Sequence, residues 1–391
     1  MSAPAIISLG CRMNIAESER MRAMLAGERD LVVINSCAVT GEALRQTRQA
    51  IRRARREHPG ARLVVTGCAA EIDRAAIGAM DEVDALVANA AKLDPRSWNI
   101  PAEAPPIAPA RTRAFVAVQN GCDHACTFCV IPQGRGASRS LPVVAVLREI
   151  EAHLAAGAQE VALTGVDLTS WGDDLPGAPR LGALVEAILT AFPALPRLRL
   201  SSVDGIEIDA GLFALLAHEP RVMPYLHLSL QHGADLILKR MKRRHRRADA
   251  VELVARLKAL RPDIAVGADL IAGFPTEDEA LHAENLAVIA ELGIVHAHVF
   301  PFSARPGTPA ARMPQLPREV IKARAADLRA RSAELRAAWL QSLVGETLPV
   351  LAERDGSGYA PNYARVSLPP GTAAGRIIDV TVREVREGLL G

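Results

Sequence analysis

Residues 119–129 read QNGCDHACTFC and place three cysteines, Cys122, Cys126 and Cys129, within eight residues. Three thiolates at this spacing can cover one face of a compact metal centre, and soft sulfur ligands favour Zn, Cu(I) or an iron–sulfur cluster. A structural zinc site needs a fourth ligand, and the only local one, His124, lies too close along the chain for a relaxed tetrahedron. A 4Fe-4S cube held by three cysteines leaves one iron open, as a catalytic metal centre requires. The alternative, three core cysteines that lie close together by chance, does not account for this spacing.

Strand-like apolar runs lie just before this loop and at regular intervals after it. Most are followed by a polar or glycine-rich segment, an alternation with helical stretches that is typical of βα units on a parallel sheet. The six expected strands are residues 115–118, 161–163, 198–200, 226–230, 264–271 and 296–300. In a barrel of parallel strands, the loops after the strands surround one mouth, where substrates bind. Six units are too few to close a TIM barrel, so we expect a partial TIM-like (βα)6 barrel whose open side admits a large substrate.

The first hundred residues contain the other three cysteines, each just beyond a strand-like run. The runs and their cysteines are residues 5–9 with Cys11, 31–34 with Cys37 and 63–65 with Cys68, and a fourth run covers residues 83–87. Helical stretches lie between them, so the pattern predicts a separate parallel α/β sheet. Because loops after parallel strands meet at one edge, the three thiols should converge there. The alternative is three unrelated core cysteines, which would lie within strands and not always beyond them.

Composition limits the function classes. At ~100–200 residues per domain, 391 residues predict two to four domains, and 49% hydrophobic with 23% charged residues suits a globular chain. The net charge of +2 excludes a polycation but allows local basic patches such as residues 239–247, KRMKRRHRR, which read equally well as a solvated helix end or a phosphate contact. No apolar run reaches the ~18–20 residues that span a bilayer, and no signal peptide is evident. We therefore expect a cytoplasmic protein with reduced cysteines.

Short strands with turn residues follow residue 345. The runs 348–351, 363–366 and 377–382 alternate with turn segments such as 355–358 and 369–371. This rhythm predicts a small C-terminal β-barrel, which by composition alone suits a capping domain as well as an RNA-binding one.

The cysteine loop resembles the cluster-binding loop of the radical S-adenosylmethionine enzymes. With the N-terminal cysteines included, nearly the whole chain resembles the methylthiotransferases of that group, and all six cysteines belong to the match. The matching strings are SLGCRMN (8–14), NSCAVT (35–40), LHLSLQ (226–231), GADLIAGFPTE (267–277) and HVFPFS (298–303).

The resemblance implies two 4Fe-4S clusters. It assigns an auxiliary cluster to Cys11, Cys37 and Cys68, and a catalytic cluster, whose open iron binds S-adenosyl-L-methionine, to Cys122, Cys126 and Cys129. The polar and glycine-rich segments after the barrel strands should form the pocket of that cofactor, and the candidate contacts are Thr164, Gly165, Ser201, Ser229 and Phe300, the last through its backbone against adenine. The implied domains are an α/β domain (1–105), a radical barrel (108–342) and a TRAM-like RNA-binding β domain (343–391).

The family has three branches, which modify isopentenyladenosine in tRNA, an aspartate of a ribosomal protein, or N6-threonylcarbamoyladenosine in tRNA. The strings CAVT (37–40), RQTRQAIRR (45–53) and QNGCDH (119–124) resemble the third branch. The implied activity is methylthiolation of carbon 2 of that nucleoside in the anticodon loop, with two S-adenosylmethionine molecules and an electron donor such as flavodoxin or ferredoxin. The sequence departs from the family pattern in two places. The segment between Cys11 and Cys37 is shorter than usual, and Val166-Asp167-Leu168 replaces the more familiar Gly-Ile/Val-His/Asn type of segment. The other two branches and a non-catalytic zinc-bound RNA-binding protein are the alternatives.

Overall fold

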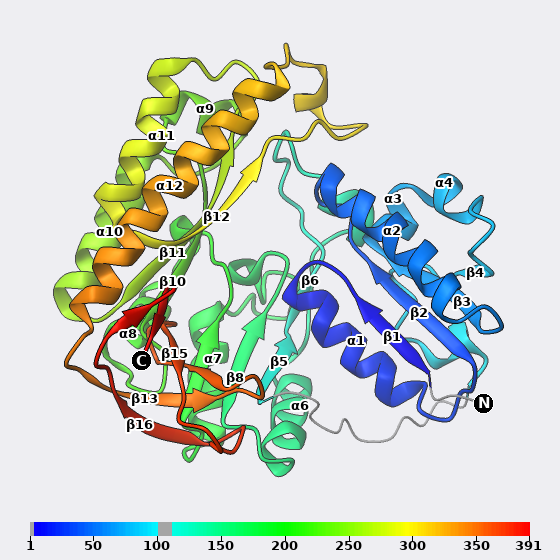
Figure 1. The fold of residues 1–391 in the computed structure, drawn as a ribbon, viewed down its shortest axis with the longest axis horizontal. Coiled ribbons are helices and arrows are strands. Elements are labelled where there is room, and N and C mark those ends of the chain that lie inside the picture. The colour runs from blue at the N-terminus through cyan, green and yellow to red at the C-terminus, as the bar shows by residue number, and fades with distance from the viewer. Residues whose placement is uncertain (1–3, 101–111) are drawn as a thin grey trace.

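The structure is a computed structural model that describes residues 4–100 and 112–391 (Figure 1). The expected boundary between the first two domains, residues 105–108, lies outside the described residues. No helix in the described part of the chain is long and apolar enough to cross a membrane.

The N-terminal segment forms a four-stranded parallel sheet in the order β1-β2-β3-β4. The strands are β1 (Ala5–Ser8), β2 (Leu31–Ser36), β3 (Arg62–Gly67) and β4 (Ala85–Leu86). The helices are α1 (Arg12–Met24), α2 (Gly41–Glu57), α3 (Cys68–Ile72) and α4 (Arg74–Gly78). Alternate side chains of β2 pack on opposite faces, with Val33 in one apolar cluster and Val32 and Ile34 in the other. The four strands predicted here are confirmed, whereas the helix expected after Cys68 is broken at Asp73 into two.

All six predicted strands of the central region are present and parallel. They are β5 (Arg113–Ala117), β8 (Glu160–Thr164), β9 (Arg197–Leu200), β10 (Tyr225–Gln231), β11 (Ala265–Ala272) and β12 (Ile294–Pro301). They pair as two three-stranded sheets, β5-β8-β9 and β10-β11-β12, and a parallel bridge between Val203 and Leu228 joins the two. The arrangement is a partial barrel of six strands.

Helices cover the outer face of this barrel (Figure 1). They are α6 (Val143–Ala155), α7 (Leu181–Ala191), α8 (Ala210–His218), α10 (Arg247–Leu260), α11 (Glu279–Leu292) and α12 (Arg318–Ser342). Shorter elements complete the region: α5 (Ile131–Arg135), α9 (Asp235–Arg240), and a hairpin of β6 (Gln119–Asn120) and β7 (Arg139–Ser140). The main core lies between the strands and these helices, and includes Leu163, Leu228 and Leu270.

Helix α1 of the N-terminal segment packs onto the inner face of the barrel at its β5 side. Met13 and Ala16 form an apolar cluster with Phe115, Ala117 and Ala162. The N-terminal sheet therefore lies against the open side of the barrel, which brings its cysteine edge toward the barrel mouth.

The C-terminal segment forms one six-stranded sheet in the order β16-β13-β14-β15-β18-β17. The strands are β13 (Thr347–Ala352), β14 (Ser357–Tyr359), β15 (Arg365–Ser367), β16 (Ile377–Thr381), β17 (Val385–Arg386) and β18 (Leu389–Leu390). Val350, Val366 and Leu390 lie in a core of their own. The edge strands β16 and β17 do not pair with each other in the described chain, so a closed TRAM-like barrel stays a prediction.

This sheet covers the N-terminal end of the barrel strands. Arg197 donates to the carbonyls of Tyr359 (3.0 Å) and Pro349, and Arg113 pairs with Glu353 at 2.7 Å. The C-terminal sheet does not cover the opposite end of the barrel strands, where the cysteine loops lie.

Candidate functional site: two cysteine triads at the barrel mouth

The loop that contains Cys122, Cys126 and Cys129 follows the β6 strand and is held from both sides. The Cys122 amide donates to the Gly136 carbonyl (3.2 Å), and the Thr127 amide donates to the Met241 carbonyl (3.1 Å). Gly121 has a φ of +76°, and a Cβ there would lie 1.9 Å from the Ala137 carbonyl oxygen, so only glycine fits this turn. The loop is thus a rigid cradle.

The sulfur atoms of this triad accept weak hydrogen bonds. The His124 amide lies 3.4 Å from the Cys122 sulfur, and the Ile131 amide 3.4 Å from that of Cys129. Burial raises the pKa of the Cys122 thiol to about 12 and that of Cys129 to about 11. Thiols of this kind become thiolates when a cation binds them, so the donor set suits a metal cluster.

The second triad, Cys11, Cys37 and Cys68, comes from the ends of β1, β2 and β3. Burial, together with the neighbouring Cys11 and Cys68, raises the pKa of the Cys37 thiol to about 11. A Cβ on Gly10 would lie 2.7 Å from the Cys37 sulfur, so this glycine admits the close approach. The structure therefore places the three thiols at one edge, as the strand pattern predicts, and this soft donor set also suits a cluster.

The two triads are neighbours. Helix α5, directly after the barrel loop, packs on α3, and a Cβ on Gly134 would lie 3.4 Å from the Cys68 Cβ. The Asn89 amide donates to the Gly134 carbonyl and lies 3.9 Å from the Cys68 sulfur. Cys68 also influences the pKa of Cys129. Groups bound at the two triads would face each other at the barrel mouth.

A buried ionic cluster links the two halves of the site: Glu17, Lys92 and Arg135, whose side chains are each 2% exposed. The Glu17 carboxylate pairs with Arg135 (2.9 Å) and with Lys92 (2.5 Å). Burial raises the pKa of Glu17, but the two cations outweigh it and hold the pKa below its ordinary value. Two cations against one carboxylate leave a net positive charge beside Cys37 and Cys68, which stabilises thiolates. Nothing in the sequence pattern identifies this cluster, because its members lie on separate elements.

Residues that flank the barrel triad form charged contacts with it. His124 lies 2.8 Å from the Asp167 carboxylate, which lies 3.6 Å from the Cys122 sulfur, and the hydrogen bond to Asp167 raises the pKa of His124. Asp167 belongs to the segment Val166-Asp167-Leu168, which departs from the sequence usual in the family. Arg243 pairs with Asp204 at 2.7 Å and reaches 3.6 Å from the Cys126 sulfur.

The environment of Arg243 differs from the one expected for the basic run 239–247. It belongs to the basic run 239–247, which was expected to be a solvated segment or a phosphate contact, yet its side chain is 8% exposed and paired. Lys242, Arg244 and Arg246 of the same run are exposed.

The five residues predicted to contact the cofactor differ in their hydrogen bonds, packing and exposure. The Thr164 carbonyl accepts from the Val118 amide, and the Ser229 carbonyl accepts from Arg243. Gly165 packs closely on Gln119. By contrast, the Ser201 hydroxyl is buried without a hydrogen-bond partner in the described chain, and Phe300 is 37% exposed on β12. Ser201 and Phe300 therefore keep groups available to a ligand.

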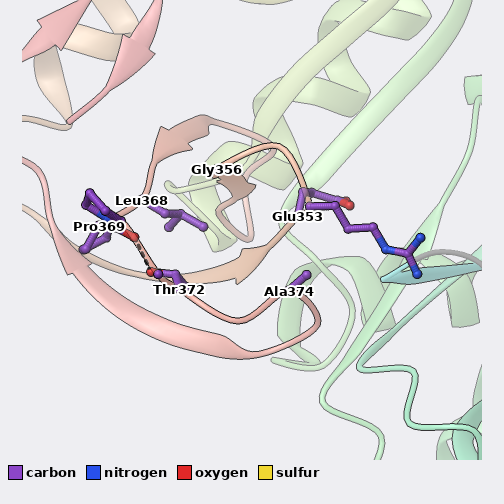
Figure 2. A pocket seen from close by; sticks show the side chains of 9 residues that line it. Glu353, Gly356, Leu368, Pro369, Thr372 and Ala374 are labelled. Atoms are coloured by element: carbon purple, nitrogen blue, oxygen red, sulfur yellow. Dashed lines mark hydrogen bonds between the residues drawn. The ribbon is translucent and has the colours of Figure 1, made fainter.

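A separate cavity of about 350 Å³ lies in the C-terminal sheet (Figure 2). It is lined by Glu353, Arg354, Gly356, Leu368, Pro369, Pro370, Gly371, Thr372 and Ala374. The Thr372 hydroxyl donates to the Pro369 carbonyl across its edge (2.7 Å). No cysteine lines it, so it is not part of the site described above.

Comparisons with known proteins agree with this geometry. Residues 116–287 match the radical SAM superfamily, and residues 4–88 match a family described as uncharacterized protein family UPF0004. Among solved structures, a radical S-adenosylmethionine methyltransferase, TsrM from Kitasatospora setae, has a similar fold: the TM-score is 0.53 at 16% identity, covering 93% of this chain and 74% of that one.

Two curated relatives match over almost their full length. Threonylcarbamoyladenosine tRNA methylthiotransferase MtaB of Rickettsia prowazekii is 40% identical over 98% of this chain and 96% of its own. The tRNA-2-methylthio-N(6)-dimethylallyladenosine synthase of Erythrobacter litoralis is 33% identical over 96% of this chain and 94% of its own. With this degree of likeness, the chain belongs to the family of radical S-adenosylmethionine tRNA methylthiotransferases and is an enzyme of the iron–sulfur, S-adenosylmethionine type.

Proposed function

We propose that this enzyme joins a methylthio group to carbon 2 of N6-threonylcarbamoyladenosine, next to the anticodon in tRNA. The relative from Rickettsia prowazekii bears the name of this activity and is 40% identical. The relative from Erythrobacter litoralis, named for dimethylallyladenosine, is 33% identical. The strings in residues 37–53 and 119–124 favour the same branch.

The observation that carries the proposal is the pair of neighbouring cysteine triads. Cys122, Cys126 and Cys129 would hold the 4Fe-4S cluster at which S-adenosylmethionine binds, and the triad of Cys11, Cys37 and Cys68 would hold the auxiliary 4Fe-4S cluster. When bound, these groups supply a radical and an activated sulfur, with a second S-adenosylmethionine as methyl donor; acid–base side chains cannot functionalise an unactivated ring carbon.

The chain's own residues would position and shield these groups. Arg135 and Lys92 supply positive charge beside the auxiliary triad, and the packing of α5 on α3 holds the two triads next to each other. Ser201 would offer its unpartnered hydroxyl to S-adenosylmethionine and Phe300 its backbone to the adenine, whereas Thr164, Gly165 and Ser229 would shape the pocket wall.

The open mouth of the barrel and exposed cationic side chains support the binding of tRNA. A loop nucleoside can be turned out of its stack without opening a duplex, which suits a mouth at the open end of a partial barrel. Lys242 and Arg246 are exposed and can contact phosphates, whereas Arg244, in the same run, pairs with Glu207 at 2.7 Å. In this proposal residues 343–391 act as a TRAM-like RNA-binding domain, a flavodoxin or ferredoxin supplies electrons, and the enzyme works in the cytoplasm.

Two triple variants test the assignment, and each is the control for the other. Reconstituted wild-type protein should hold about eight irons, and either triple Cys→Ala variant about four. Without Cys122, Cys126 and Cys129, 5′-deoxyadenosine should not form. Without Cys11, Cys37 and Cys68, it should still form, but mass spectrometry should detect no methylthiolated nucleoside. A variant of the second kind that still methylthiolates tRNA would overturn the proposal.

A further inference from the structure

The inner face of β10, β11 and β12 bears a row of polar side chains that the cysteine sites do not use. Side chains alternate along a strand, and Leu226, Leu228 and Leu270 face the helices in the main core. Tyr225, His227 and their neighbours on the opposite face therefore line the inside of the barrel.

Three of these side chains form a compact cluster: His227, Asp269 and His298. His227 Nε2 and His298 Nδ1 each lie 3.1 Å from Asp269 Oδ1, and the two imidazole rings are 4.6 Å apart. Burial alone would raise the pKa of Asp269, but the two imidazoles outweigh it and hold that pKa well below its ordinary value. The carboxylate is thus fully ionised and orients both rings.

The cluster is continuous with an aromatic pair. The Tyr225 hydroxyl lies 2.8 Å from His227 Nδ1, so both nitrogens of His227 are engaged. A Cβ on Gly267 would lie 2.3 Å from that hydroxyl and 2.5 Å from His227 Nδ1, so this hydrogen bond needs a glycine at 267. Tyr363, from the C-terminal sheet, stacks on Tyr225 with ring centroids 4.8 Å apart.

One donor of this row and one cationic side chain beside it can still contact a ligand. The His298 side chain is 59% exposed, and Asp269 occupies only its Nδ1; Nε2 has no partner among residues 4–100 and 112–391. Arg12 directly follows Cys11, and its Nη2 lies 2.7 Å from the Tyr363 hydroxyl. Its charge also acts on Tyr225, as does that of Asp269. The guanidinium of Arg12, at the start of α1, and the imidazole of His298, on β12, therefore both border the polar interior of the barrel.

We propose that Arg12 and His298 bind the carboxylate of an anionic N6 substituent on the target adenosine, with Asp269 as the positioning residue for His298. The inference rests on the proposed function, in which that substituent is a threonylcarbamoyl group. Guanidinium and imidazole N–H groups are donors that recognise carboxylates. An uncharged alkyl substituent would offer Arg12 and His298 Nε2 no carboxylate, so the subsite selects between branches of the family.

The test compares two anticodon stem-loops, one with N6-threonylcarbamoyladenosine and one with the methyl ester of its threonyl carboxylate. With wild-type holoenzyme, the ester should raise KM by about tenfold or more, because a charge-assisted contact is lost. Arg12→Met and His298→Gln should each reduce the ratio of the two KM values toward one while 5′-deoxyadenosine still forms. Asp269→Asn should act in the same direction as His298→Gln. Arg22→Met, an exposed change on the same helix as Arg12, is the matched control and should keep the wild-type ratio.

The outcomes separate the subsite from the proposed function. Equal KM values for acid and ester in wild type, or an unchanged ratio in both variants, overturn the subsite while the activity stands. Turnover of a dimethylallyladenosine stem-loop in place of the acid overturns both. A divalent metal ion beyond the cluster iron that is lost in His298→Gln, with no change in the ratio, would identify the cluster as a metal site and also overturn the subsite.

Discussion

The buried cluster of Glu17, Lys92 and Arg135 gives a quantitative test of how the two halves of the site are joined. Glu17→Gln removes the one carboxylate that pairs with Arg135 at 2.9 Å and Lys92 at 2.5 Å, and it leaves two buried cations facing each other. Removal of one partner from a buried pair costs about 3–5 kcal/mol, because the remaining charge is uncompensated. We expect a loss of this size, together with a further fall in the pKa of Lys92, which burial already lowers.

The assay is urea unfolding of the apo protein, monitored by hydrogen exchange of the β2 and β3 amides. These amides report the stability of the N-terminal sheet separately from that of the barrel. Iron content after reconstitution gives a second measure, since Arg135 stabilises the Cys37 and Cys68 thiolates. The double variant Glu17→Gln/Arg135→Met removes a cation as well, so it should lose less stability than the two single changes together. Glu57→Gln, which breaks only an exposed pair with Arg53, is the control and should leave unfolding unchanged.

Two results would refute this reasoning. A loss below about 1 kcal/mol for Glu17→Gln would mean that water reaches the three charges and screens them. Additive effects in the double variant would mean that Glu17 and Arg135 act independently.

Three further predictions concern the residues Gly121, His282 and Tyr363. Gly121→Ala should abolish 5′-deoxyadenosine formation and lower the iron content, because its Cβ would lie 1.9 Å from the Ala137 carbonyl oxygen; a variant with normal iron would show that the loop can shift. Hydrogen bonds to Glu277 and Asp327 raise the pKa of His282, so this group stabilises the fold below the ordinary histidine pKa and the contribution is lost as pH rises through the raised value; Asp327→Asn should lower the His282 pKa in an NMR titration, and an unchanged pKa would contradict the assignment. Tyr363→Ala should free the C-terminal sheet from the barrel, since it loses the stack on Tyr225 and the bonds to Arg12 and Arg113; limited proteolysis near residue 345 should accelerate, and an unchanged rate would show that Glu353 and the Arg197 contacts suffice.

Local sequence was sufficient to predict both parallel sheets. The run from Leu31 to Ile34 and the five-residue run at 226–230 are short, apolar and bounded by polar or turn residues, and both are strands within two residues of the expected ends. The convergence of the three N-terminal cysteines also followed from the chain, since parallel strands bring their C-terminal ends to one edge. Arg243 was misread, because a run of charges does not show which member meets a buried acid such as Asp204.

Strand period, residue type and close spacing are local properties of the chain, so the strands, the grouping of the cysteines and the family could be predicted from it. Which distant residues meet depends on the folded arrangement. Glu17, Lys92 and Arg135 lie on separate elements, and so do the two donors of the proposed carboxylate subsite, Arg12 on α1 and His298 on β12. Their pairing depends on how α1 packs against the open side of the barrel and how the C-terminal sheet covers its base. Such contacts arise from the burial of whole faces and leave no fixed spacing in the sequence.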